Sequence, residues 1–271
     1  MKQYLSRIAV GSAFFACCMF LSALILMSRD RLAKMPDPKM GVLDDLGFRI
    51  LPFVPYPKAC YAFNMILCVL TIGPLLTLHC RRFKIFKRLM VIAGLVSLVN
   101  SLSKVVTVIP TNARCSKIVN SNIMQKAAMV FINPLACEGL LLFGDSHFVS
   151  LMGFLWHEYS AGIFPLSTDP GRTRDLIKVF VFLWWMIAGL GYLLIISTHL
   201  QYSIHALFSI LVVKQVFFSF HTFVKTPERL TTVPFLSWYE TDFEDINEKT
   251  SLMFDYRSGS LRNSNRNSNR L

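Results

Sequence analysis

Polar side chains gather at one end of a long apolar stretch, residues 195–220. Five of them fall within seven positions: His199, Gln201, Tyr202, Ser203 and His205. Imidazole groups act as general bases and as nucleophiles near neutral pH, so this cluster is a candidate for acid–base or group-transfer chemistry. Gln201 and His205 are four positions apart, and on a helix this spacing directs two side chains toward one point.

A second polar group, Asp145 and His147, lies in another apolar stretch, residues 140–156. An acid that faces a histidine between two apolar helices either forms a structural pair or takes part in proton transfer. His147 and His199 are most simply explained as residues near a membrane boundary. Cys-x-x-Cys pairs, zinc-type spacings and Gly-rich phosphate loops are absent from the sequence, so we expect neither a metal nor a cofactor.

The composition indicates which elements must position these residues. Hydrophobic side chains make up 54% of the 271 residues and charged ones 16%, against about 25% charged in soluble domains. The net charge of +12 comes from short basic runs between apolar stretches, a pattern that orients membrane proteins and argues against nucleic-acid binding. We therefore predict an all-α, polytopic membrane protein.

Six apolar stretches are long enough, or nearly so, to cross the roughly 30 Å hydrocarbon layer. The predicted spans are 8–27, 59–78, 89–109, 140–156, 179–197 and 200–220. The first is longer than the apolar core of a signal peptide, about 7–15 residues, so we expect it to be retained. The basic run 81–88 is expected on the cytosolic side, which places both termini in the cytosol and residues 28–58 and 111–138 on the exoplasmic side.

Polar residues in the third predicted span indicate that one of its faces turns toward protein or water. They are Asn100, Ser101, Ser103 and Lys104.

We expect residues 1–220 to form a six-span membrane domain, and residues 221–271 to form a cytosolic tail that is disordered from about 257. Cys115 and Cys137 both fall in an exoplasmic connection, where a disulfide is chemically allowed.

Several segments in register resemble the sphingomyelin synthases, within the lipid phosphate phosphatase-like group. The resemblance covers residues 37–220 and is carried by DDLGFRILP, CRRFKIFKRLMVIAGLVSLVNSLSKVVTVIP, CEGLLLFGDSHFVSLMGFLWHEYS and QYSIHALFSILVVKQVFFSFH. It implies a lipid phosphatase-like core of six spans and a head-group transfer from phosphatidylcholine to ceramide that releases diacylglycerol. It also implies that paired arginines, here Arg81 and Arg82, and the motif residues Tyr202 and Ser203 contact lipid.

The catalytic positions of the family are substituted in this sequence. The resemblance places Asp145 where the family has an acid–base histidine, Gln201 at the nucleophilic histidine, and His205 at the aspartate that orients it. A glutamine amide is neither a useful nucleophile nor a base, so the family mechanism cannot run through Gln201. His147 and His199 lie two positions from the expected places and would serve only if the register shifts.

We therefore expect a sphingomyelin-synthase-like protein with impaired catalysis, in the Golgi, endoplasmic reticulum or plasma membrane. Two alternatives stay open: a working phosphocholine or phosphoethanolamine transferase that uses the rearranged residues, and an unrelated channel or transporter subunit. The expected partners are phosphatidylcholine, ceramide and diacylglycerol. A homo- or hetero-oligomer is also open.

Overall fold

A computed structural model describes residues 2–32, 45–79, 81–106, 122–132, 146–163, 170–199 and 201–240. Every regular element in these ranges is a helix, which confirms the all-α prediction. The helices are α1 (Lys2–Leu32), α2 (Leu46–Ile50), α3 (Pro57–Thr77), α4 (Arg82–Val106), α5 (Ile123–Ile132), α7 (Ser146–Tyr159), the 3₁₀ turn η1 (Ser160–Gly162), α8 (Pro170–Ser197), α9 (Ser203–Lys225), α10 (Pro227–Thr232) and α11 (Pro234–Glu240).

Five of the described helices, α1, α3, α4, α8 and α9, are long and apolar enough to cross a membrane. Such a set is typical of a multi-pass membrane protein. The helices extend beyond most of the stretches predicted for them. In α4, for example, the basic run is itself helical and the helix starts at Arg82, seven positions before the predicted start at 89.

The predicted span 140–156 corresponds in the described residues to α7, which is a different kind of helix. It has 14 residues, or about 21 Å at 1.5 Å per residue, so it is shorter than the hydrocarbon layer. Residues 146–147 and 149–156 of it are buried, and it packs against α3, α4 and α8. It is an internal helix whose side chains face protein, and residues 140–145 of the predicted span lie outside the described ranges.

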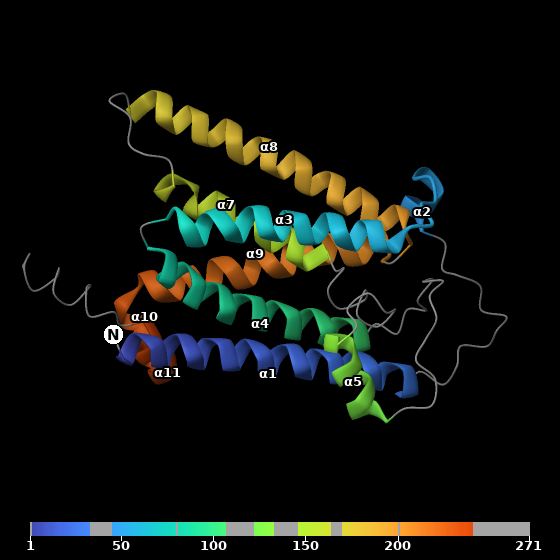
Figure 1. The fold of residues 1–271 in the computed structure, drawn as a ribbon, viewed down its shortest axis with the longest axis horizontal. Coiled ribbons are helices and arrows are strands. Elements are labelled where there is room, and N and C mark those ends of the chain that lie inside the picture. The colour runs from blue at the N-terminus through green and yellow to red at the C-terminus, as the bar shows by residue number, and fades with distance from the viewer. Residues whose placement is uncertain are drawn as a thin grey trace, which may run out of the picture. The chain divides into compact units, whose positions relative to one another are not determined.

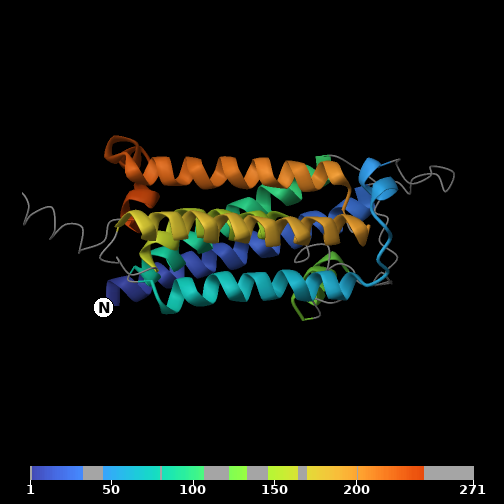
Figure 2. The same ribbon diagram turned by 90° about the horizontal axis from the view of Figure 1, so that it is seen from above.

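Residues 1–219 form one compact unit and residues 220–271 a second. Within the first unit, α1 packs along α4, and α3 packs on α7 and α8. The helices α1, α3 and α4 run side by side in both views (Figures 1 and 2). In the second unit, Phe235 stacks on Tyr239 within α11, with ring centroids 5.9 Å apart. The tail from 241 onward, including the predicted disorder from 257, lies outside the described residues.

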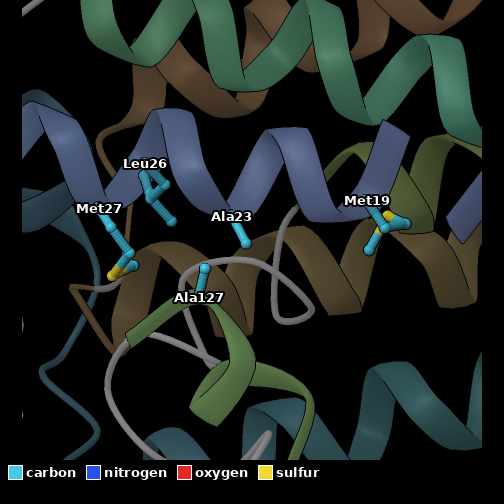
Figure 3. Close-up of a cluster of buried hydrophobic side chains, with 5 residues drawn as sticks. All are labelled: Met19, Ala23, Leu26, Met27 and Ala127. Atoms are coloured by element: carbon cyan, nitrogen blue, oxygen red, sulfur yellow. The ribbon is translucent and has the colours of Figure 1, made fainter. Parts of the chain in front are cut away.

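The short helix α5 is held to α1 by apolar side chains. Met19, Ala23, Leu26 and Met27 of α1 and Ala127 of α5 are all buried in one cluster. Ala127 and Ala23 point toward each other across the contact (Figure 3). Small residues at this point let the two backbones approach closely, as in many packed membrane helices.

The orientation of the helices in the membrane stays a prediction, which cysteine accessibility can test. Arg82 and Phe53 are exposed and lie near opposite ends of α3, Arg82 at the start of α4 and Phe53 beyond α2. Each can be replaced by cysteine as a probe. We expect a membrane-impermeant thiol reagent applied to intact cells to label Phe53→Cys and not Arg82→Cys, because the basic run stays cytosolic. The reverse pattern would overturn the predicted topology, and labelling of permeabilised cells shows that both sites react.

Candidate functional site

Polar side chains from four parts of the fold meet around the first turns of α7. We call this group the buried polar cluster. It consists of Ser97 and Asn100 of α4, Ser146, His147 and Ser150 of α7, Tyr192 of α8, Gln201 just before α9, and Ser209 in the second turn of α9. All are at least nine-tenths buried except Tyr192, which is half-buried. Polar groups inside an apolar bundle are stable only when hydrogen-bonded, and these partners explain why the cluster folds as it does.

Ser146 connects α7 to α9. Its hydroxyl donates to Gln201 Oε1 at 2.8 Å and lies 2.8 Å from the hydroxyl of Ser209. The Ser209 hydroxyl in turn donates to the main-chain carbonyl of His205 at 2.9 Å. Since the partner of Ser146 is an amide oxygen and not a base, nothing in this contact turns the serine into a nucleophile.

Tyr192 and Ser150 close the cluster on the side of α8. The Ser150 hydroxyl donates to the main-chain carbonyl of Ser146 at 3.2 Å, and the Tyr192 hydroxyl reaches the same carbonyl at 3.3 Å. The two hydroxyls also hydrogen-bond to each other. These bonds fix the first turn of α7 against α8 and so hold the Ser146 hydroxyl in place.

His147 faces the other way, toward α4. Its Nδ1 lies 3.1 Å from Asn100 Nδ2, and its Nε2 lies 3.3 Å from Ser97 Oγ. An amide nitrogen can only donate, so in this arrangement Nδ1 accepts and Nε2 carries the hydrogen that is donated to Ser97. Both ring nitrogens are therefore engaged, and the side chain is 1% exposed. Lys104, one turn beyond Asn100, is also buried, and so is Ser101, which confirms that this face of α4 turns toward protein.

Asp45 joins α2 to the start of α9. Its Oδ1 accepts from the main-chain N–H of Gly47 and from the Ser203 hydroxyl, and its Oδ2 accepts from the main-chain N–H of Ser203, each at 2.7 Å. One carboxylate thus caps the first turns of two helices, where the helix dipoles favour a negative charge. Burial raises the pKa of Asp45, but the hydrogen bonds from Ser203, Gly47 and Phe48 outweigh it, and the net pKa is lowered from 3.8.

The rest of this contact is aromatic, and with Asp45 we call it the Asp45 clamp: residues 45–54 held on the corner 197–203 between α8 and α9. The ring of Phe48 stacks on that of His199, with centroids 4.0 Å apart, and lies 5.1 Å from that of Tyr202. His199 has a φ of 55°, a left-handed conformation that turns the chain from α8 into α9. The main-chain N–H of Val54 donates to the Ser197 carbonyl at 2.9 Å.

The structure therefore divides the residues predicted from the sequence among several places. Gln201 belongs to the buried polar cluster, and His147 lies on its α4 side. His199, Tyr202 and Ser203 belong to the Asp45 clamp. His205 is half-buried in the first turn of α9. Asp145, Cys115 and Cys137 lie outside the described residues, so a contact of Asp145 with His205 and a disulfide between Cys115 and Cys137 stay predictions.

Arg81 and Arg82 lie at the far end of α4. Arg82 is 15 residues from Ser97, about 22 Å along the helix, so the two arginines lie outside the buried polar cluster. Both are exposed. Beside them His79 accepts the main-chain N–H of Arg81 on Nδ1 at 2.9 Å, and its pKa is lowered by burial and by the positive charge of Arg81.

Several residues of these contacts, among them Asp45, Ser146 and Ser209, were not among the site residues predicted from the sequence. Asp45 had a visible signal, since an acid directly before a short apolar segment is a common helix cap. The two serines had none, because a serine in an apolar helix usually bonds to its own backbone. Among the described residues no group of three or more His, Cys, Asp or Glu side chains is placed to hold a metal ion.

The described cluster offers neutral hydrogen-bond donors and acceptors and one histidine engaged on both sides. It can orient a polar group, and the Ser97 hydroxyl that contacts His147 accepts from Nε2 in this arrangement, so the imidazole does not act on it as a base. No protein-family model matches this sequence, and no curated protein matches it significantly. The likeness to the sphingomyelin synthases thus rests on the motifs quoted above.

Proposed function

We propose that this chain is a sphingomyelin-synthase-like membrane protein that binds two-chain lipids but transfers their head groups poorly or not at all. The lipids concerned are phosphatidylcholine, diacylglycerol and ceramide, in a membrane of the secretory pathway or at the cell surface.

The contact between Ser146 and Gln201 carries the proposal. The ungapped alignment assigns these residues to two different family motifs, which are 55 positions apart in the chain. Their side chains nevertheless lie 2.8 Å apart, as they would if both motifs lined one site. The alignment does not depend on this proximity, so the contact supports it independently.

The same contact supports weak catalysis. Gln201 stands at the position of the family nucleophile, is 6% exposed and has its amide oxygen bound to the Ser146 hydroxyl. An amide has no lone pair on nitrogen available to attack phosphorus, and it does not accept a proton at neutral pH. Apolar surface suited to acyl chains is present on α8, where Leu190 and Leu193 are exposed.

Transfer and binding are tested separately on purified protein in liposomes of phosphatidylcholine with fluorescent ceramide. We expect no sphingomyelin above the level of protein-free liposomes. We expect native mass spectrometry of the delipidated protein, exposed again to diacylglycerol or phosphatidylcholine, to show a bound lipid. Phosphocholine transfer by the unmodified protein at an ordinary enzymatic turnover, about 1–1000 per second, would overturn the proposal. His147 and His199 would then be the leading catalytic candidates.

Restoring the family residues gives a sharper test. Asp145→His, Gln201→His and His205→Asp together should raise phosphocholine transfer above background, because the nucleophile, its orienting acid and the second histidine act as a unit. Gln201→His alone should not. Asp175→Asn, at an exposed position in the first turns of α8, serves as the matched control. Equal rates for the triple and the single variant would contradict the alignment.

A further inference from the structure

Lys214 lies at the middle of α9 on an exposed face. It is 11 residues from Ser203 and 11 from Lys225, so about 16 Å of helix separates it from either end. Its side chain is exposed, as is that of Gln215 next to it. Apolar neighbours on the same face recur at helical spacing and are also exposed: Ile204, Leu207, Phe208, Leu211 and Phe218. We call this face, including Lys214 and Gln215, the Lys214 stripe.

No other candidate span in the described residues has a face like this one. On α3 and α8 the exposed interior positions are apolar, for example Val69, Leu183 and Leu190. The exposed charges of α4 and α8 lie in the first three turns, where they reach the membrane boundary, and Lys104 in the interior of α4 is buried. Within the described spans, the Lys214 stripe thus alone places an exposed charge at mid-depth.

Hydrocarbon accommodates this ammonium group only at a high free-energy cost. A lysine side chain extends about 6 Å, well short of the distance from Lys214 to either end of α9, so it cannot reach the interface as terminal lysines do. Charged residues inside membranes pair with an opposite charge or line a polar path. Among the described residues, no hydrogen bond, ion pair or ring contact involves Lys214. Gln215 bonds only locally, donating to Ser219 at 3.1 Å.

A second copy of the chain does not supply the missing partner. The described parts of the five candidate spans have no acidic residue in their interior; Asp175, in the first turn of its span, is exposed and paired with Lys178. Two chains that met through this face would also bring Lys214 against Lys214, and like charges at close range repel. The complement of the Lys214 stripe is an apolar surface with one carboxylate at mid-depth.

We propose that the Lys214 stripe binds a transmembrane helix of another membrane protein, and that this helix presents an Asp or Glu at mid-membrane. The carboxylate pairs with Lys214 and accepts a hydrogen bond from Gln215, while the apolar residues pack along the rest of the contact. The surface is distinct from the buried polar cluster, so the inference does not depend on the proposed lipid function.

The test measures energy transfer in liposomes between the labelled full chain and synthetic transmembrane peptides of leucine with one central residue varied. We expect the peptide with central Glu to associate at least about tenfold more strongly than the all-leucine peptide. Lys214→Leu should remove this difference, whereas Lys214→Arg should keep it. Lys178→Leu, at an exposed lysine near the start of α8, should leave it unchanged. Lys214→Leu removes a costly charge and is expected to insert and fold.

Three results would overturn the proposal. One is that the Glu peptide does not associate with the chain, or that it associates equally well with the Lys214→Leu variant. Another is energy transfer between differently labelled copies of the chain without peptide, lost in Lys214→Leu, which would show a second copy on this face. The third is rapid reaction of Leu211→Cys with a membrane-impermeant thiol reagent, which would show a water-filled path beside the stripe.

Discussion

Asp45→Ala is expected to lower the free energy of unfolding by about 3 kcal/mol, the largest effect of any single substitution outside the predicted spans. The variant loses a carboxylate that accepts three hydrogen bonds from Gly47 and Ser203 at 2.7 Å. A helix cap contributes about 1 kcal/mol and a hydrogen bond to a charged group about 1.5–3 kcal/mol, and partial exposure reduces the sum. Thermal unfolding in one detergent, followed by tryptophan fluorescence, measures the loss.

Two further variants test the cause of this effect. Asp45→Asn keeps one acceptor oxygen but turns an amide NH₂ toward a donor, so it should lose about half as much stability as Asp45→Ala. Asp175→Asn removes a carboxylate that is 74% exposed and pairs with Lys178, and it should change stability by less than about 0.5 kcal/mol. Equal unfolding temperatures for Asp45→Ala and Asp175→Asn would show that the Asp45 clamp does not stabilise the fold.

The lowered pKa of Asp45 adds a pH dependence with a definite sign. Its ordinary value is 3.8, and the folded state holds it lower. The folded state therefore releases the proton more readily than the unfolded state, and the clamp contributes fully above about pH 4. This contribution declines as the pH falls through the folded pKa. Asp45→Asn should lose less stability than the unmodified chain over the same acid range.

Gly153→Ala and Gly189→Ala are expected to change stability in opposite directions. A Cβ on Gly153, in the buried face of α7, would meet ring carbons of Trp185 at 2.8 Å. Such a clash forces the indole or the helices apart and should cost about 2 kcal/mol. A Cβ on Gly189 of α8 meets nothing within 4 Å, and alanine there should add about 0.5–1 kcal/mol because it restricts the unfolded chain.

The unfolding temperatures of the two glycine variants, measured side by side in one detergent, check this prediction. Gly73→Ala in α3 also meets nothing within 4 Å apart from its chain neighbours, but the ring of the following Pro74 disfavours a helical residue with a Cβ, so it should gain less stability than Gly189→Ala. A loss of stability in all three variants would mean that alanine is poorly accommodated for reasons other than contact with Trp185. A gain in Gly153→Ala would show that α7 and α8 pack less closely than the structure places them.

The long lipid-facing helices were predictable from the sequence because their signal is local. An apolar run of about 20 residues satisfies its own backbone hydrogen bonds and buries itself in lipid whatever its neighbours do. The polar residues of α4 were informative for the same reason, since Asn100 and Lys104 have to avoid lipid. Internal α7 has no such signal, because its environment is protein and its length is set by the helices around it.

The candidate site was less predictable because its contacts join distant parts of the chain. Gln201 was identified from its type and place, but its partner Ser146 lies 55 positions away and looks like any helical serine. Ser203 was expected to contact lipid, which stays a prediction; its bond to Asp45, 158 positions away, had no counterpart in the sequence analysis. Sequence spacing describes one helix at a time, whereas these pairs depend on how α2, α7 and α9 pack.

The short length of α7 also sets how deep the buried polar cluster lies. With the end of α7 at Tyr159 on one boundary of a roughly 30 Å hydrocarbon layer, its 14 residues bring Ser146 only about 21 Å across. The cluster then lies about 9 Å inside the opposite boundary, beneath the plane where lipid head groups are hydrated. Under the proposed lipid function, a head group that reached Gln201 would have to sink below its neighbours and shed part of its water. The bilayer itself would then be a barrier to entry.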